Sequence, residues 1–180
     1  MLANLRALFV VVIDIIRFKG GPENLPTSTT LLACVVAAFA AATAIAAAQV
    51  ATPAQQGWPA EVFGIVVTLV WYQVSLRNAK KRERFVQTMT AWFAVRALFV
   101  PAVLPMSAVI LADLAAHRTT PLPFALATAV LSLWLLAIEV RIIRGAFEWP
   151  TAGALGMVLA QEFATALLFG ILLGLTSNPG

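Results

Sequence analysis

The chain has 180 residues, of which 61% are hydrophobic and only 11% are charged. Soluble domains carry roughly 25% charged residues, so this composition excludes an ordinary soluble domain and indicates an integral membrane protein. The single Cys and single His exclude an intramolecular disulfide and give no basis for a haem, a His-based metal centre or another cofactor. The net charge of +4 comes mainly from connections between apolar runs. No aromatic residues interleave with the charges of the most basic connection, residues 77–84, and no soluble domain is present, so nucleic acid binding is not expected.

Residues 1–19 are apolar but interrupted by charge. Arg6, Asp14 and Arg17 fall within about 80° of one another if this stretch is helical. The pattern predicts an amphipathic helix over 1–19 that lies in the cytoplasmic membrane interface. A signal peptide is the competing interpretation. It is disfavoured because Asp14 breaks the apolar stretch and no small-residue cleavage site follows.

Five apolar runs follow, and each is close to the ~20 residues that cross a bilayer as a helix. They cover 29–50, 59–76, 85–112, 123–143 and 151–175. Helices satisfy every backbone polar group internally, as the hydrocarbon core of a bilayer demands. The predicted fold is an all-α integral membrane protein. It is a five-transmembrane-helix bundle with an N-terminal amphipathic interfacial helix, and 1–180 form a single membrane domain.

The Lys and Arg residues are distributed unevenly among the connections. Of the 12 in the chain, most precede the first run or follow the second and fourth runs, whereas the alternate connections carry only Arg118. Basic connections face the cytoplasm. We therefore predict a multi-pass protein of the bacterial inner (plasma) membrane, with a cytoplasmic N-terminus and a C-terminus outside, in the periplasm. An odd number of spans agrees with this orientation.

The connection after the second run is the most basic part of the chain. Its candidate contacts to anionic lipid headgroups are Lys80, Lys81, Arg82 and Arg84. Such charges contribute about 1 kcal/mol each near an anionic surface. The favoured alternative is that they only set topology. The bilayer and its anionic headgroups are in either case the predicted partners.

Arg96 and Glu162 each lie near the middle of an apolar run, roughly 15 Å from its basic end at 1.5 Å per residue. A charge at that depth is costly unless it is paired, which makes it a candidate functional residue. Their opposite signs predict a buried pair, with Gln161 or Thr165 as a second donor. The favoured interpretation is that this pair fixes the register of the bundle. The alternative is ion, proton or substrate handling.

Glu139 is a third acid within an apolar run, but it lies nearer the basic end than Arg96 and Glu162. A contact with Arg96 would need a shift of one to two helical turns. We therefore expect Glu139 to pair with Arg141 or Arg144 at the surface and keep it as an additional candidate polar residue.

Small residues recur at helical spacing in the first run. The set is Ala37, Ala41, Ala44 and Ala48. Such faces let helices approach closely. Internal packing is the favoured interpretation, and a homo-oligomer or another membrane subunit is the alternative partner.

No phosphate-binding loop, zinc motif or Ser-His-Asp pattern is present. Asp113 and His117 lie four residues apart, where a hydrogen bond between them is expected, but no nucleophile accompanies them. We therefore predict that the chain is not an enzyme and has no catalytic residues. The function expected is a scaffold, assembly or membrane-organising role, with a small transporter or channel subunit that uses Arg96 and Glu162 as the alternative.

Two segments carry a family resemblance. They are Gly-Pro-Glu-Asn-Leu-Pro, which ends at Pro26, and the third run with its Leu-Phe-Val-Pro-Ala-Val-Leu-Pro stretch, which ends at Pro105. With its five spans and short connections, the chain resembles Yip1-type membrane proteins. The resemblance implies a cytoplasmic N-terminus and tightly packed spans. For bacterial members it implies no defined activity and no site residues.

Overall fold

The computed structural model describes residues 2–48 and 58–176. Within these ranges the regular structure is helical, with no strand. The α-helices are α1 (Leu2–Ile16), α2 (Thr29–Ala48), α3 (Trp58–Asn78), α4 (Phe85–Ala115), α5 (Leu122–Phe147) and α6 (Thr151–Thr176). Two short 3₁₀ helices are η1 (Pro22–Asn24) and η3 (Arg82–Arg84). The predicted all-helical fold is confirmed for the part of the chain that the structure describes.

Within the described residues, four helices are long and apolar enough to cross a membrane. They are Thr29–Ala48, Arg82–Ala115, Leu122–Phe147 and Thr151–Leu172. These match the first, third, fourth and fifth predicted runs. The second predicted run, 59–76, falls in α3, which is not among the four. The structure therefore supports a membrane-embedded helical protein with four such helices, and the count of five stays a prediction.

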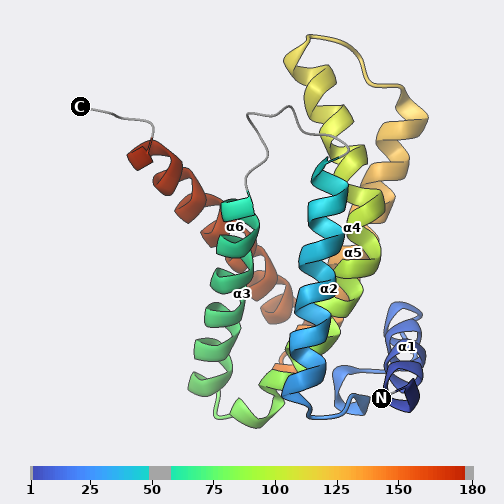
Figure 1. Ribbon diagram of the computed structural model, residues 1–180, viewed down its shortest axis with the longest axis vertical. Coiled ribbons are helices and arrows are strands. Elements are labelled where there is room, and N and C mark those ends of the chain that lie inside the picture. The colour runs from blue at the N-terminus through green and yellow to red at the C-terminus, as the bar shows by residue number, and fades with distance from the viewer. Residues whose placement is uncertain (1, 49–57, 177–180) are drawn as a thin grey trace.

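Helix α4 is the centre of the bundle. It contacts α2, α5, α3 and α1, and Figure 1 shows α2 lying alongside it. Helix α6 crosses the bundle obliquely and contacts both α5 and α3. All residues of α4 from Thr88 to Val95 are buried. A helix that is buried all round belongs to the interior of a bundle, so this part of α4 forms the core around which the site is built.

Helix α1 packs on the outside of this core. Val12 and Ile15 are buried against the bundle, whereas Phe9 and Val10 are exposed. Figure 1 shows α1 beside the lower half of the bundle, where it contacts α4 and α5. The predicted helix over 1–19 thus ends at Ile16. Its placement in a membrane interface stays a prediction.

Four helices end at a left-handed residue that is not a glycine. Phe18, Lys80, His117 and Glu148 adopt left-handed backbone conformations with φ between 53° and 59°. After α4, the amide of Arg118 donates to the carbonyl of Asp113 at 2.8 Å, which is the hydrogen bond of a Schellman cap. The expected Asp113–His117 hydrogen bond is wrong. Instead, the Asp113 carboxylate accepts from the Thr120 hydroxyl at 3.0 Å, because His117 is used to turn the chain.

The small-residue face of α2 does not pack inside the protein. Ala37, Ala41, Ala44 and Ala48 are all exposed. Helix α2 instead packs through larger residues, among them Leu31 and Val35, which are buried. The favoured interpretation of internal packing is therefore wrong. The larger Leu and Val side chains make more van der Waals contacts with neighbouring helices than Ala does.

Candidate functional site

Arg96 joins three helices through one guanidinium group. Its Nε lies 2.6 Å from Glu139 Oε1 and its Nη2 lies 3.2 Å from Glu139 Oε2. The same Nη2 donates a hydrogen bond to Glu162 Oε1. Because these residues lie on α4, α5 and α6, Arg96 connects the central helix to both of its successors. We call Arg96, Glu139 and Glu162 the buried cluster.

The two carboxylates of the buried cluster lie in different surroundings. The Glu139 side chain is 3% exposed, whereas that of Glu162 is 44% exposed. The Arg96 guanidinium also lies 4.0 Å from the centre of the Trp92 ring, a cation–π contact that lowers the cost of burying the charge. The buried cluster is therefore enclosed at Glu139 and open at Glu162.

The structure brings Arg96 and Glu162 together, as the sequence predicts, but it contradicts the prediction for Glu139. Glu139 pairs with Arg96, not with Arg141 or Arg144. The reason is rotation about the axis of α5. Residues 139 and 141 point about 200° apart on a helix, so a helix that buries Glu139 turns Arg141 outward. Arg141 accordingly donates from Nε to the carbonyl of Gly20.

Gln161 belongs to a neighbouring polar group and does not serve as a second donor to the pair. Its Nε2 lies 3.1 Å from the hydroxyl oxygens of both Thr68 and Thr165. Thr68 is on α3, so this contact connects α3 to α6. Gln161 is 1% exposed, and its Oε1 is buried without a hydrogen-bond partner in the structure. An unpaired buried carbonyl is costly, which marks a place where water or a ligand would bind.

A cavity of about 130 Å³ lies next to these polar groups. Its wall includes Thr43, Thr68, Arg96, Glu162 and Thr165. We call it the central cavity. At about 30 Å³ for each water, this space holds a few water molecules. The exposed end of the buried cluster therefore faces a small chamber between α2, α3, α4 and α6, in which these polar groups lie among apolar side chains such as Phe39, Ile65 and Phe93.

Three residues of this region were not predicted from the sequence as part of it. Trp92 precedes Arg96 by four residues, one helical turn, and that spacing is a usable signal. Tyr72 is fully buried, with its ring centre 6.4 Å from that of Trp92. Its hydroxyl and the Trp92 Nε1 have no hydrogen-bond partner in the structure. Thr68 and Tyr72 lie on α3, and no sequence pattern indicates that α3 faces Arg96.

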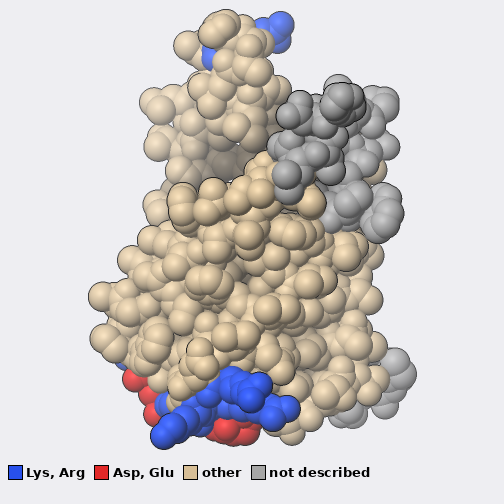
Figure 2. Space-filling model, turned by 90° about the vertical axis from the view of Figure 1, so that its left-hand side faces the viewer, with Lys and Arg blue, Asp and Glu red and all other residues tan. Residues whose placement is uncertain are grey.

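Most of the charged side chains on the face shown in Figure 2 gather at one end of the molecule, and a few basic atoms lie at the opposite end. At the more highly charged end, Arg84 Nη2 lies 2.5 Å from Glu148 Oε1, and Lys81 pairs with the other carboxylate oxygen. Arg84 Nη1 also donates to the carbonyl of Gly145 at 3.0 Å. Hydrogen bonds from Lys81 and Arg84 hold the pKa of Glu148 below its usual value. We call these three charged residues the surface cluster.

The surface cluster changes how the predicted headgroup residues are understood. Lys81 and Arg84 are engaged by Glu148, whereas Lys80 and Arg82 are exposed. Arg84 also satisfies carbonyl groups at the end of α5, where a helix leaves its last acceptors unpaired. At least two of the four predicted headgroup contacts therefore have a structural role within the protein.

The fold and the two clusters describe a helical membrane protein with an internal polar site. Among the described residues, no group of three or more His, Cys, Asp and Glu side chains is arranged to hold a metal ion. Comparisons of the chain with protein-family models, curated proteins and solved structures found no match. The argument for function therefore depends on the geometry of this chain.

Proposed function

We propose that the chain is a non-enzymatic scaffold or membrane-organising protein of the bacterial inner membrane. One observation carries this proposal: the single Arg96 guanidinium bonds Glu139 on α5 and Glu162 on α6. A charge with two partners on different helices fixes their rotation and depth together. Polar side chains serve this purpose in other helix bundles, where a buried polar contact specifies register.

The high cost of breaking a buried ion pair favours a role for Arg96 in fixing the positions of the helices. Breaking a buried ion pair by removing one partner costs about 3–5 kcal/mol, because the remaining charge stays buried. In the hydrocarbon core of a bilayer no water is present to replace the lost partner. A sliding or rotating helix would therefore separate Arg96 from at least one carboxylate at a substantial cost.

We propose that α3 is the fifth span and that α1 lies at the cytoplasmic interface. Along α3, four exposed valines recur every four residues and form one apolar stripe: Val62, Val66, Val70 and Val74. Such a stripe is suited to contact lipid. Helix α3 has 21 residues, or about 31 Å at 1.5 Å per residue. Five spans with the observed basic connections give a cytoplasmic N-terminus and an outside C-terminus, in agreement with the Yip1-type resemblance.

Cysteine labelling tests this topology. The chain has one cysteine, Cys34, so Cys34→Ala gives a background free of other thiols. In that background we expect a membrane-impermeant maleimide applied to intact spheroplasts to label Ser177→Cys but not Asn78→Cys. Labelling of Asn78→Cys from outside would remove α3 from the spans and contradict the five-span arrangement. Labelling of Asn78→Cys after the spheroplasts are lysed is the control. It checks that this cysteine reacts once the reagent can reach the cytoplasmic side.

A substitution cycle tests whether Arg96 fixes the positions of the helices. Arg96→Met is expected to lower the yield of folded protein sharply, because Glu139 is left buried without a partner. Adding Glu139→Gln and Glu162→Gln to Arg96→Met removes both stranded charges, and the yield is expected to recover in part. A triple variant that is no better than Arg96→Met would contradict a role limited to helix register.

A small transporter or channel subunit is the second candidate. It is favoured by the charge of the buried cluster, which has one cation and two carboxylates, and by Glu162 in the wall of the central cavity. The excess negative charge calls for a proton or a small cation at that end. Glu162→Gln leaves the Arg96–Glu139 pair intact, so it separates the two candidates. Proton or cation flux in reconstituted vesicles that is lost in Glu162→Gln, with folding unchanged, would favour transport over the scaffold role.

A further inference from the structure

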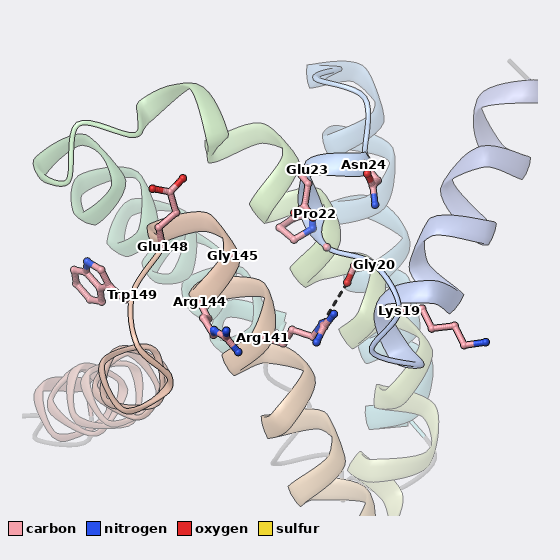
Figure 3. A pocket seen from close by; sticks show the side chains of 11 residues that line it. Lys19, Gly20, Pro22, Glu23, Asn24, Arg141, Arg144, Gly145, Glu148 and Trp149 are labelled. Carbon is pink, nitrogen blue, oxygen red and sulfur yellow. Dashed lines mark hydrogen bonds between the residues drawn. The ribbon is translucent and has the colours of Figure 1, made fainter.

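A second hollow, larger than the central cavity, opens at the basic end of the molecule. Its volume is about 490 Å³. One wall is the segment from Lys19 to Asn24, and the other is the last turn of α5 with Glu148 and Trp149 (Figure 3). We call it the basic pocket. It shares no residue with the buried cluster, so its ligand chemistry is a separate question.

The shape of the basic pocket depends on close packing between its two walls. A Cβ atom at Gly145 would meet the Pro22 ring at 3.5 Å, which is ordinary contact distance with no room beyond it. Pro22 itself is buried. The start of η1 therefore packs against α5 at Gly145, and the pocket lies beside this contact.

The cations around the basic pocket are only partly used by the protein. Arg141 donates from Nε to the Gly20 carbonyl at 3.3 Å, the contact drawn in Figure 3. Arg144 lies three residues further on and makes no ion pair or hydrogen bond with another described residue. Lys19 belongs to the opposite wall, and Figure 3 shows its side chain extending away from the two arginines. Arg144 is thus a guanidinium held at the mouth of a pocket, with its donors unused by the described residues.

The acids of the pocket do not cancel these cations fully. The Glu148 carboxylate is held by Lys81 and Arg84, which come from outside the basic pocket. The Glu23 side chain folds back toward Gly21. Its carboxylate occupies the space that a Cβ atom on Gly21 would take. The carboxyl end of α5 adds some negative potential, and Arg84 offsets it by bonding the Gly145 carbonyl. Lys19, Arg141 and Arg144 therefore give the pocket an excess of positive charge, which favours an anion as its ligand.

We propose that the basic pocket binds a phosphate group through Arg144 and Arg141, with the charge of Lys19 on the opposite wall adding attraction. Arginine presents a planar fork of donors that matches the oxygens of phosphate. Trp149 lies in the wall and is 39% exposed, and Trp side chains favour the boundary between lipid and water. A phosphate at this level comes from an anionic lipid headgroup or from the aqueous phase, and the binding chemistry is the same for both.

Titration of the purified full chain in detergent tests the proposal with two probes. One probe is a short-chain phosphatidylglycerol and the other is inorganic phosphate. Arg144→Gln is expected to weaken binding by at least fivefold, the effect of about one charge near an anionic group. Arg144→Gln combined with Lys19→Gln is expected to weaken it further. The matched control is Arg77→Gln, which makes the same change in charge at an exposed position in the last turn of α3, outside the pocket.

Each outcome decides the question. Binding of the lipid alone, weakened by Arg144→Gln and not by Arg77→Gln, supports the pocket and assigns the phosphate to a headgroup. Binding of both probes with the same dependence supports the pocket and assigns a soluble phosphate as a competing source. Equal effects of Arg144→Gln and Arg77→Gln, or no binding of either probe, overturn the proposal. Arg144 is exposed, and thermal unfolding of each variant verifies that folding is unchanged.

Discussion

The buried cluster and the surface cluster use the same chemistry at nearly the same distance. Arg96 Nε lies 2.6 Å from Glu139, and Arg84 Nη2 lies 2.5 Å from Glu148. In both, arginine on or beside α4 meets glutamate on or beside α5. The exposed fraction of the carboxylate side chain differs greatly, at 3% for Glu139 and 60% for Glu148. Geometry alone therefore cannot say which pair matters more to the fold.

The degree of burial determines how strongly each cluster holds the fold, because it determines whether water can solvate a charge whose ion-pair partner is removed. At the surface, water solvates a released carboxylate and salt screens the attraction. In the bundle, a released charge remains in an apolar environment where solvation is poor. The buried cluster is thus a strong constraint on helix position, whereas the surface cluster mainly arranges the end of α5. The following substitutions sharpen this contrast in order of expected size.

The largest effect is expected from removing the shared cation. Arg96→Ala leaves Glu139 and Glu162 facing each other without a counter-charge, so unfolding should become easier by about 3–5 kcal/mol. Thermal or denaturant unfolding in detergent measures the change. Arg84→Ala is the matched control in the surface cluster and is expected to change stability much less. Equal losses from the two substitutions would remove the contrast between the clusters.

Within the buried cluster, the two carboxylates are expected to differ. Glu139→Gln removes the negative charge and leaves only one of the two acceptor oxygens that bind Arg96, and it should cost about 1–3 kcal/mol of unfolding free energy. Glu162→Gln acts on a half-exposed group and should cost less than about 1 kcal/mol. The same unfolding assay compares them. A larger loss from Glu162→Gln would show that the open end of the cluster, and not the enclosed end, holds the helices.

The distribution of apolar residues along the sequence predicted most of the fold. Four predicted runs correspond to four membrane-length helices, because hydrophobic length is a property of the sequence itself. The common level of Arg96 and Glu162 along the bundle, which lets them meet, was also predictable, since residue count along a helix measures height directly. Both predictions needed only distance along one axis.

The rotation of each helix about its own axis, and which helices are neighbours, could not be predicted by counting residues along the sequence. Glu139 was expected at the surface because its depth appeared too shallow, but the tilt and packing of α5 bring it to Arg96. The exposed alanines of α2 and the buried Tyr72 of α3 are the same kind of error. In an apolar helix nearly every face is hydrophobic. Hydrophobic patterning therefore does not tell a face that meets lipid from one that meets another helix.

The smallest effect is expected from the surface cluster, and pH reveals it. Hydrogen bonds from Lys81 and Arg84 lower the pKa of Glu148 in the folded protein below the usual value of a glutamate side chain. A lowered pKa means that folding favours the charged form, so this contribution is complete above the unfolded pKa and is lost as pH falls through the folded one. Unfolding of the wild type and Glu148→Gln should differ slightly near neutral pH. That difference should shrink as pH falls below about 4.5 and should also weaken at high salt. A difference that persists unchanged in acid would mean that Glu148 acts through packing and not through its charge, which would set the surface cluster apart from the buried one in kind as well as in strength.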